Sequence, residues 1–83
     1  MSQFETKVKE VLIDMLGAEE HEITPEARIR EELGADSLDE VELIMELEKE
    51  YHITITKEEA EKVKTVFDIY SLLEKKVTNE QTT

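Results

Sequence analysis

EELGADSLDEVELIMELEKEY, residues 31–51, is the stretch of the sequence that decides the fold. Asp36 is a good helix N-cap, and the apolar residues that follow it recur at the spacing of an α-helix. The β-branched segment ITIT, residues 53–56, interrupts this spacing. We therefore predict a helix that begins at Asp36 or Ser37 and ends at about Tyr51.

This helix carries two apolar stripes and one acidic sector. At about 100° per residue, one stripe is the predicted core face, formed by Leu43, Ile44, Leu47 and Tyr51. A second stripe, centred roughly 140° away, is formed by Leu38, Val41 and Met45. The acidic sector just beyond it is formed by Asp39, Glu42, Glu46 and Glu50.

The second stripe has two interpretations. A central helix that touches two neighbours buries both stripes. Alternatively, the stripe is a docking surface, with a small apolar centre and a carboxylate rim that steers a basic partner. No Lys or Arg lies between Glu31 and Lys49 to offset the acidic sector, and uncompensated charge costs stability. This favours docking.

The rest of the chain predicts an all-α domain. A helical pattern covers residues 3–16, with Ser2 and Glu5 placed as a capping box and Gly17 as the C-terminal cap. A long loop follows up to Asp36. Its apolar side chains, predicted to hold it against the core, are Ile23, Ile29 and Leu33.

Two shorter signals complete the fold. Residues 53–56 could form a strand, but no partner strand is evident, so we predict an extended connector. A capping box at Thr56 opens a short helix over 57–62, and Thr65 with Asp68 caps a helix over 66–77. The expected architecture is a four-helix bundle with a short third helix and a long loop between helices one and two. Residues 1–78 form the domain, and residues 79–83 a flexible tail.

Composition limits the function. The chain has 83 residues, no cysteine, and 22 acidic against 10 basic side chains, for a net charge of −12. This charge repels nucleic acid and anionic lipid and attracts basic protein surfaces. The N-terminal residues lack the pattern of a signal peptide, and no apolar run approaches the ~20 residues that span a bilayer. We expect a cytoplasmic protein that does not insert into membranes.

Ser37 is the candidate functional residue. A serine hydrolase is not expected, because the G-x-S-x-G elbow is absent and the only histidines, His21 and His52, lie in a loop and a connector. No EF-hand alternation is present, so we expect no metal site. Ser37 is then either a helix N-cap or first-turn residue, or a substrate whose attached phosphate would meet the positive end of the helix dipole.

GADSLD, residues 34–39, followed by VEL, residues 41–43, resembles the acyl carrier proteins of dissociated, type II fatty acid synthesis. The resemblance extends over roughly residues 3–77. It implies a non-catalytic carrier in which a holo-acyl-carrier-protein synthase attaches 4′-phosphopantetheine from coenzyme A to Ser37. The terminal thiol then carries fatty acyl chains as thioesters. Glu40 departs from the pattern, since it is bulkier and more charged than the family's usual neighbour of the motif.

The resemblance also implies partners and a pocket. Residues expected to bind partner enzymes with basic surfaces are Asp36, Leu38, Asp39, Val41, Glu42, Met45 and Glu46. Residues expected to shelter the acyl chain are Leu43, Ile44, Leu47, Tyr51, Ile55, Ala60 and Ile69. We expect a monomer. Two alternatives are a carrier of the same fold for polyketide, lipid A or other specialised acyl chemistry, and an unmodified acidic interaction module.

Overall fold

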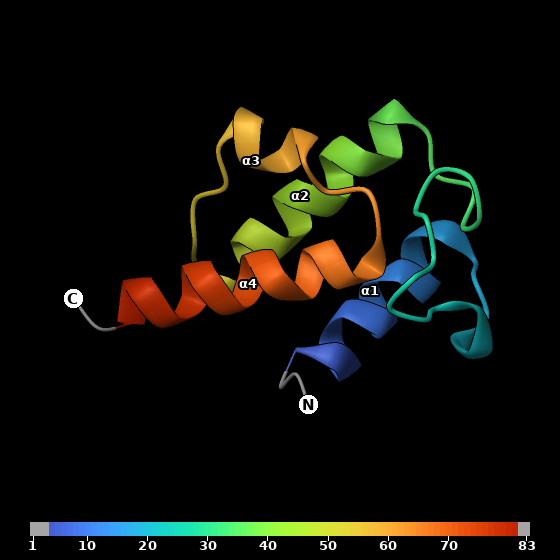
Figure 1. Ribbon diagram of the computed structural model, residues 1–83, viewed down its shortest axis with the longest axis horizontal. Coiled ribbons are helices and arrows are strands. Elements are labelled where there is room, and N and C mark those ends of the chain that lie inside the picture. Colours follow the sequence, from blue (N-terminus) through green and yellow to red (C-terminus); the bar gives the residue numbers. More distant parts are fainter. Residues whose placement is uncertain (1–3, 82–83) are drawn as a thin grey trace.

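The computed structural model describes residues 4–81, and within this range the fold is all-α. Its helices are α1 (Glu5–Leu16), α2 (Ser37–Tyr51), α3 (Lys57–Glu61) and α4 (Val66–Gln81), with a short 3-10 helix, η1 (Glu20–Glu22), in the first loop (Figure 1). The described range contains no β-strand, and residues 53–56 form an extended connector as predicted. None of the helices in this range is long and apolar enough to cross a membrane.

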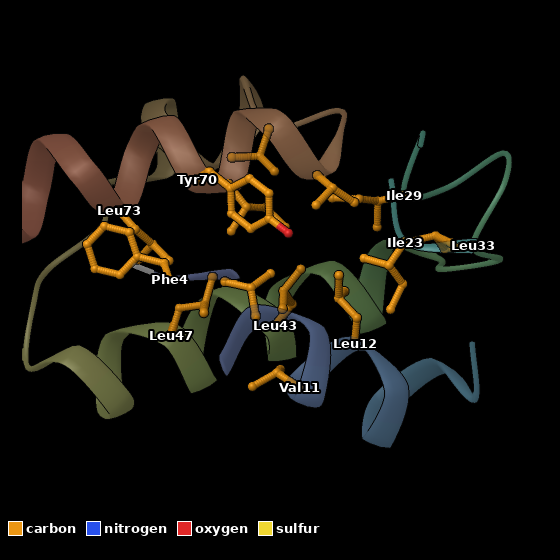
Figure 2. Packing of buried hydrophobic residues seen from close by; sticks show 14 of the residues in the cluster. Phe4, Val11, Leu12, Ile23, Ile29, Leu33, Leu43, Leu47, Tyr70 and Leu73 are labelled. Atoms are coloured by element: carbon orange, nitrogen blue, oxygen red, sulfur yellow. The ribbon is translucent and has the colours of Figure 1, made fainter. Parts of the chain in front are cut away.

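The core lies between α4 on one side and α1 with α2 on the other (Figure 2). Leu12 of α1, Leu47 of α2 and Leu73 of α4 are completely buried in it. Where α1 begins and α2 ends, the rings of Phe4 and Tyr51 meet edge to face, with 5.3 Å between their centroids. Aliphatic packing of three helices therefore holds the bundle together.

The long loop is held against the core as predicted. Ile23, Ile29 and Leu33 are all buried. The backbone also fixes the loop to the start of α4: the N–H of Ile29 donates to the carbonyl of Lys64 at 3.0 Å, and the N–H of Val66 donates to that of Ala27 at 3.1 Å. These bonds matter for the site, because they place the turn that follows Ile29 beside the beginning of α2.

Side chains cap three of the helices as the sequence predicts. The Asp36 carboxylate accepts a hydrogen bond from the N–H of Asp39 at 2.9 Å, and the Asp39 carboxylate accepts one from the N–H of Asp36 at 3.2 Å. Thr56 at the start of α3 forms the same reciprocal motif with the third residue of that helix. Thr65 accepts the N–H of Asp68 at 3.2 Å ahead of α4. These bonds satisfy amide donors that a helix start leaves unpaired.

Two predicted boundaries need correction. The helix α1 begins at Glu5, with Phe4 at the N-cap and no side-chain cap bond, and the Ser2 of the predicted capping box lies outside the described residues. The helix α4 continues to Gln81, beyond the predicted end at residue 77. Residues 79–81 of the predicted tail are therefore helical. Their polar composition favours an earlier end of the helix, although these residues contain no helix-breaking Pro or Gly.

His52 ends α2 in a strained conformation that allows a stability prediction. Its φ of 56° and ψ of 48° are left-handed, a region that costs a residue with a Cβ about 1–2 kcal/mol. Glycine adopts this conformation freely and is the usual residue there. We expect His52→Gly to raise the free energy of unfolding in urea by about 0.5–1 kcal/mol, since the greater freedom of unfolded glycine offsets part of the gain. Thr54→Gly, an exposed change on the same connector, should not stabilise the protein. A His52→Gly protein no more stable than the wild type would show that the cap is unstrained.

Candidate functional site

Ser37 is the first residue of α2, and its side chain is exposed. The N-cap role belongs to Asp36, whose carboxylate accepts the amide of Asp39. Ser37 is therefore a first-turn residue and not the N-cap, and its exposed hydroxyl lies at the positive end of the helix.

An arginine contacts the Ser37 hydroxyl, and sequence reasoning missed it. The Arg30 Nη2 group donates to Ser37 Oγ at 3.1 Å. The same guanidinium makes a two-point ion pair with Glu40, at 2.9 Å from Nε and 3.0 Å from Nη2. The hydrogen bond and charge of Glu40 raise the pKa of Arg30, so this side chain stays charged at every physiological pH. The sequence signal was Glu40 itself, the charged residue that departs from the family pattern.

The second apolar stripe of α2 is exposed. Leu38, Val41 and Met45 retain 64%, 55% and 60% of their accessible surface. On the predicted core face, Leu43 and Leu47 are buried, whereas Ile44 and Tyr51 are partly buried. The interpretation in which both stripes are buried is wrong, because no described element of this chain covers the second one.

Three of the acidic side chains near Ser37 have partners within the chain. The carboxylates of Asp36 and Asp39 each accept a hydrogen bond from the other residue's backbone N–H, and Glu40 forms an ion pair with Arg30. Further along the sector, Lys7 of α1 lies 3.4 Å from Glu50. Lys7, from outside α2, therefore compensates one carboxylate of the acidic sector, which the spacing of charges within the helix did not reveal.

A hollow of about 450 Å³ begins at Ser37 and Arg30 and extends between α2 and α3. Three of the residues predicted to shelter an acyl chain line it: Ile44, Ile55 and Ala60. The other four do not. Leu43, Leu47 and Ile69 are buried in the core, and Tyr51 packs against Phe4. A larger surface depression of about 740 Å³ lies along the later part of α2, and Ser37 is not among the residues that line it.

The contacts of the Ser37 hydroxyl limit what the site can do chemically. The partner of the Ser37 hydroxyl is a guanidinium, which cannot take a proton as a general base must. Among the side chains that the structure describes, no group of three or more His, Asp or Glu is placed to hold a metal ion. An exposed oxygen beside a cation and a helix start nevertheless fits a covalently attached phosphate.

Comparison with known proteins agrees with this chemistry. The family model described as "Phosphopantetheine attachment site" matches residues 6–73. The chain therefore belongs to this family, whose domain is the site of covalent 4′-phosphopantetheine attachment and acts as a carrier rather than a catalyst.

A similar solved structure indicates which kind of carrier fold this chain has. The chain is similar to a structure described as "a putative acyl carrier protein" from Mycobacterium tuberculosis, with 32% sequence identity and a TM-score of 0.80. The match covers 86% of this chain and 95% of that chain. The fold is accordingly that of acyl carrier proteins, and the predicted all-α class is confirmed.

Proposed function

We propose that this carrier protein holds the acyl intermediates of fatty acid biosynthesis on 4′-phosphopantetheine attached to Ser37. The observation that carries the proposal is the position of the Ser37 hydroxyl. It is exposed at the start of α2, it is free of a capping role, and it lies inside the matched family region.

The attachment step needs an external enzyme. Ser37 Oγ would form a bond to the phosphorus of the pantetheine phosphate in coenzyme A, while the bond from that phosphorus to adenosine 3′,5′-bisphosphate breaks and the nucleotide leaves with the electron pair. The hydroxyl proton would pass to a base of the transferase, because Arg30 is the side chain that contacts Ser37. The attached group supplies a terminal thiol that holds acyl chains as thioesters.

The hollow beside Ser37 supports a shelter for the acyl chain. Ile44, Ile55 and Ala60 give it aliphatic walls. Each buried methylene contributes about 0.8 kcal/mol, so even a short chain gains by entering. A longer chain would need α2 and α3 to part before it reached core residues such as Leu47 and Ile69. The bound chain would then stabilise the folded state.

The exposed face of α2 supports docking of basic partner enzymes, among them a holo-acyl-carrier-protein synthase. Leu38, Val41 and Met45 would form the apolar centre of the contact. Glu42 and Glu46 make no ion pair within the described part of the chain, so both carboxylates are available to Lys and Arg of a partner. Asp36 and Asp39 already cap the helix, and they would add negative potential at its start.

Enzymes of known pathways can test the acyl chemistry. The phosphopantetheinylated protein is offered to a malonyl transacylase of type II fatty acid synthesis and, separately, to a polyketide acyltransferase. Intact mass measures the acyl group gained. We expect efficient malonyl transfer by the fatty acid enzyme. Acylation by the polyketide enzyme alone would contradict the fatty acid assignment and favour a specialised carrier.

Reversing one charge on α2 should weaken partner binding. We expect Glu42→Lys or Glu46→Lys to reduce affinity for the transacylase by about 3–10-fold, mainly through slower association at low salt. Glu74→Lys makes the same charge change at an exposed position of α4 and should leave affinity nearly unchanged. Surface plasmon resonance at two salt concentrations measures both effects. Equal losses for the α2 and α4 variants would mean that only net charge matters and that α2 is not the docking surface.

A further inference from the structure

Arg30 is placed beside Ser37 by the fold as well as by its own ion pair. Ile29, the preceding residue, is buried, and its N–H is bonded to the carbonyl of Lys64. The turn that follows is closed by the N–H of Leu33, which donates to the carbonyl of Arg28 at 3.1 Å. The backbone of Arg30 is therefore fixed on both sides, so the guanidinium starts from a defined position next to α2.

Glu40 then orients the guanidinium. Its two carboxylate oxygens accept from Nε and Nη2, a side-on pair that fixes the plane of the group. One Nη2 hydrogen remains for Ser37 Oγ, at 3.1 Å. Nη1 makes no hydrogen bond within the part of the chain that the structure describes, and 55% of the Arg30 side chain is exposed. The guanidinium thus has spare donors on Nη1, while its Nη2 already contacts Ser37 Oγ.

A surface ion pair alone gives little reason for this arrangement. Exposed pairs of this kind contribute little to stability. A phosphate on Oγ would give the arrangement a clear use, because its two unbridged oxygens carry the negative charge and the acceptor sites that a guanidinium binds. The carboxylates of Asp39 and Glu40 already lie in the first turn, that of the N-cap residue Asp36 precedes them, and a further negative charge there requires compensation.

We propose that Arg30 is the residue that binds the phosphodiester of the attached phosphopantetheine, with Glu40 holding its guanidinium in place. This inference rests on the proposed function, because the phosphate is present only if Ser37 is modified. In the unmodified protein Arg30 donates to the hydroxyl. In the modified protein it donates to the unbridged phosphate oxygens, fixing the direction in which the arm leaves α2 toward the hollow.

Nuclear magnetic resonance of the full chain before and after modification tests the contact. In the wild type, the Arg30 side-chain N–H signal should shift on modification more than that of Arg28. The phosphorus signal of the modified protein should also move when urea unfolds it. Arg30→Gln should remove most of this phosphorus shift. Arg28→Gln should preserve it, since Arg28 lies in the same turn but its nearest ion-pair partner is Glu31, at 4.0 Å.

Thermal unfolding gives an independent readout. We compare the shift in the thermal unfolding midpoint that modification causes in each protein. This shift should be about 2–4 °C more positive in the wild type and in Arg28→Gln than in Arg30→Gln. Arg30→Lys should recover part of that difference, because it restores the charge without the planar fork.

The outcomes separate this inference from the proposed function. Intact mass establishes whether each protein was modified. A wild-type chain that gains no phosphopantetheine would overturn the proposed function and this inference together. A modified wild type in which the Arg30 signal moves no more than that of Arg28 would overturn this inference alone, without recourse to any variant.

Discussion

Replacing Ser37 with alanine should abolish phosphopantetheine addition completely. The variant lacks the oxygen that accepts the group, and no other side chain can supply it in the same position at the start of α2. The measurement is the intact mass of the protein after incubation with a phosphopantetheinyl transferase, magnesium and coenzyme A. Ser71→Ala, which removes an exposed hydroxyl from α4, is the matched control and should be modified like the wild type.

The Ser37→Ala protein should remain folded. Asp36 and Asp39 keep the capping box, and the variant loses a hydrogen bond at an exposed position, worth about 1 kcal/mol or less. Its far-ultraviolet circular dichroism should match that of the wild type. Loss of the helical spectrum would make Ser37 a structural residue, and continued modification would place the attachment site elsewhere.

The same substitution, leucine to alanine, should have very different effects on the free energy of unfolding at two positions of α2, Leu47 and Leu38. Leu47 is completely buried between α2 and the rest of the core, so its truncation should cost about 2–5 kcal/mol. Leu38 is 64% exposed, and its truncation should change stability by no more than about 0.5 kcal/mol. For a domain whose total stability is about 5–15 kcal/mol, the first change removes a large share.

Urea unfolding followed by circular dichroism measures both variants. The expected contrast would confirm in solution that α2 has one buried and one exposed apolar stripe. Similar losses for Leu47→Ala and Leu38→Ala would mean that both stripes are buried, and the exposed docking surface would then be rejected. Partner binding should show the opposite order, with Leu38→Ala weakened while folded Leu47→Ala is affected less.

Much of the fold could be predicted because its signals are local. The Asp36 cap and the apolar spacing after it were enough to predict α2, and Thr56 and Thr65 identified the beginnings of α3 and α4. The loop side chains Ile23 and Ile29 were recognisable as buried because a polar loop has few other reasons to carry them.

The features that could not be predicted depend on contacts between distant residues or on backbone conformation. The Arg30–Glu40 pair joins positions on a loop and a helix, and charge spacing within α2 does not reveal it. Nothing in the local sequence indicates that His52 has a positive φ. Tyr51 shares the apolar face of α2 with Leu47. Only the position of Phe4 shows that the Tyr51 ring packs against Phe4 and not beside the hollow.

The role of Ser37 illustrates the same limit. Spacing alone could not distinguish a capping serine from a modified one. The structure excludes the capping role because Asp36 fills it, and the family match adds the chemistry of the attached group. The exposed stripe of α2 then becomes relevant as a surface that partner enzymes could bind, and the hollow beside α3 as a shelter for the acyl chain.

Peptide mapping of the wild-type chain tests the central proposal most directly. The protein is treated with a phosphopantetheinyl transferase and coenzyme A, digested, and the fragment that contains Ser37 is sequenced by tandem mass spectrometry. We predict a single 4′-phosphopantetheine group, carried by Ser37. An unmodified Ser37 fragment, or the group on any other residue, would contradict the proposal.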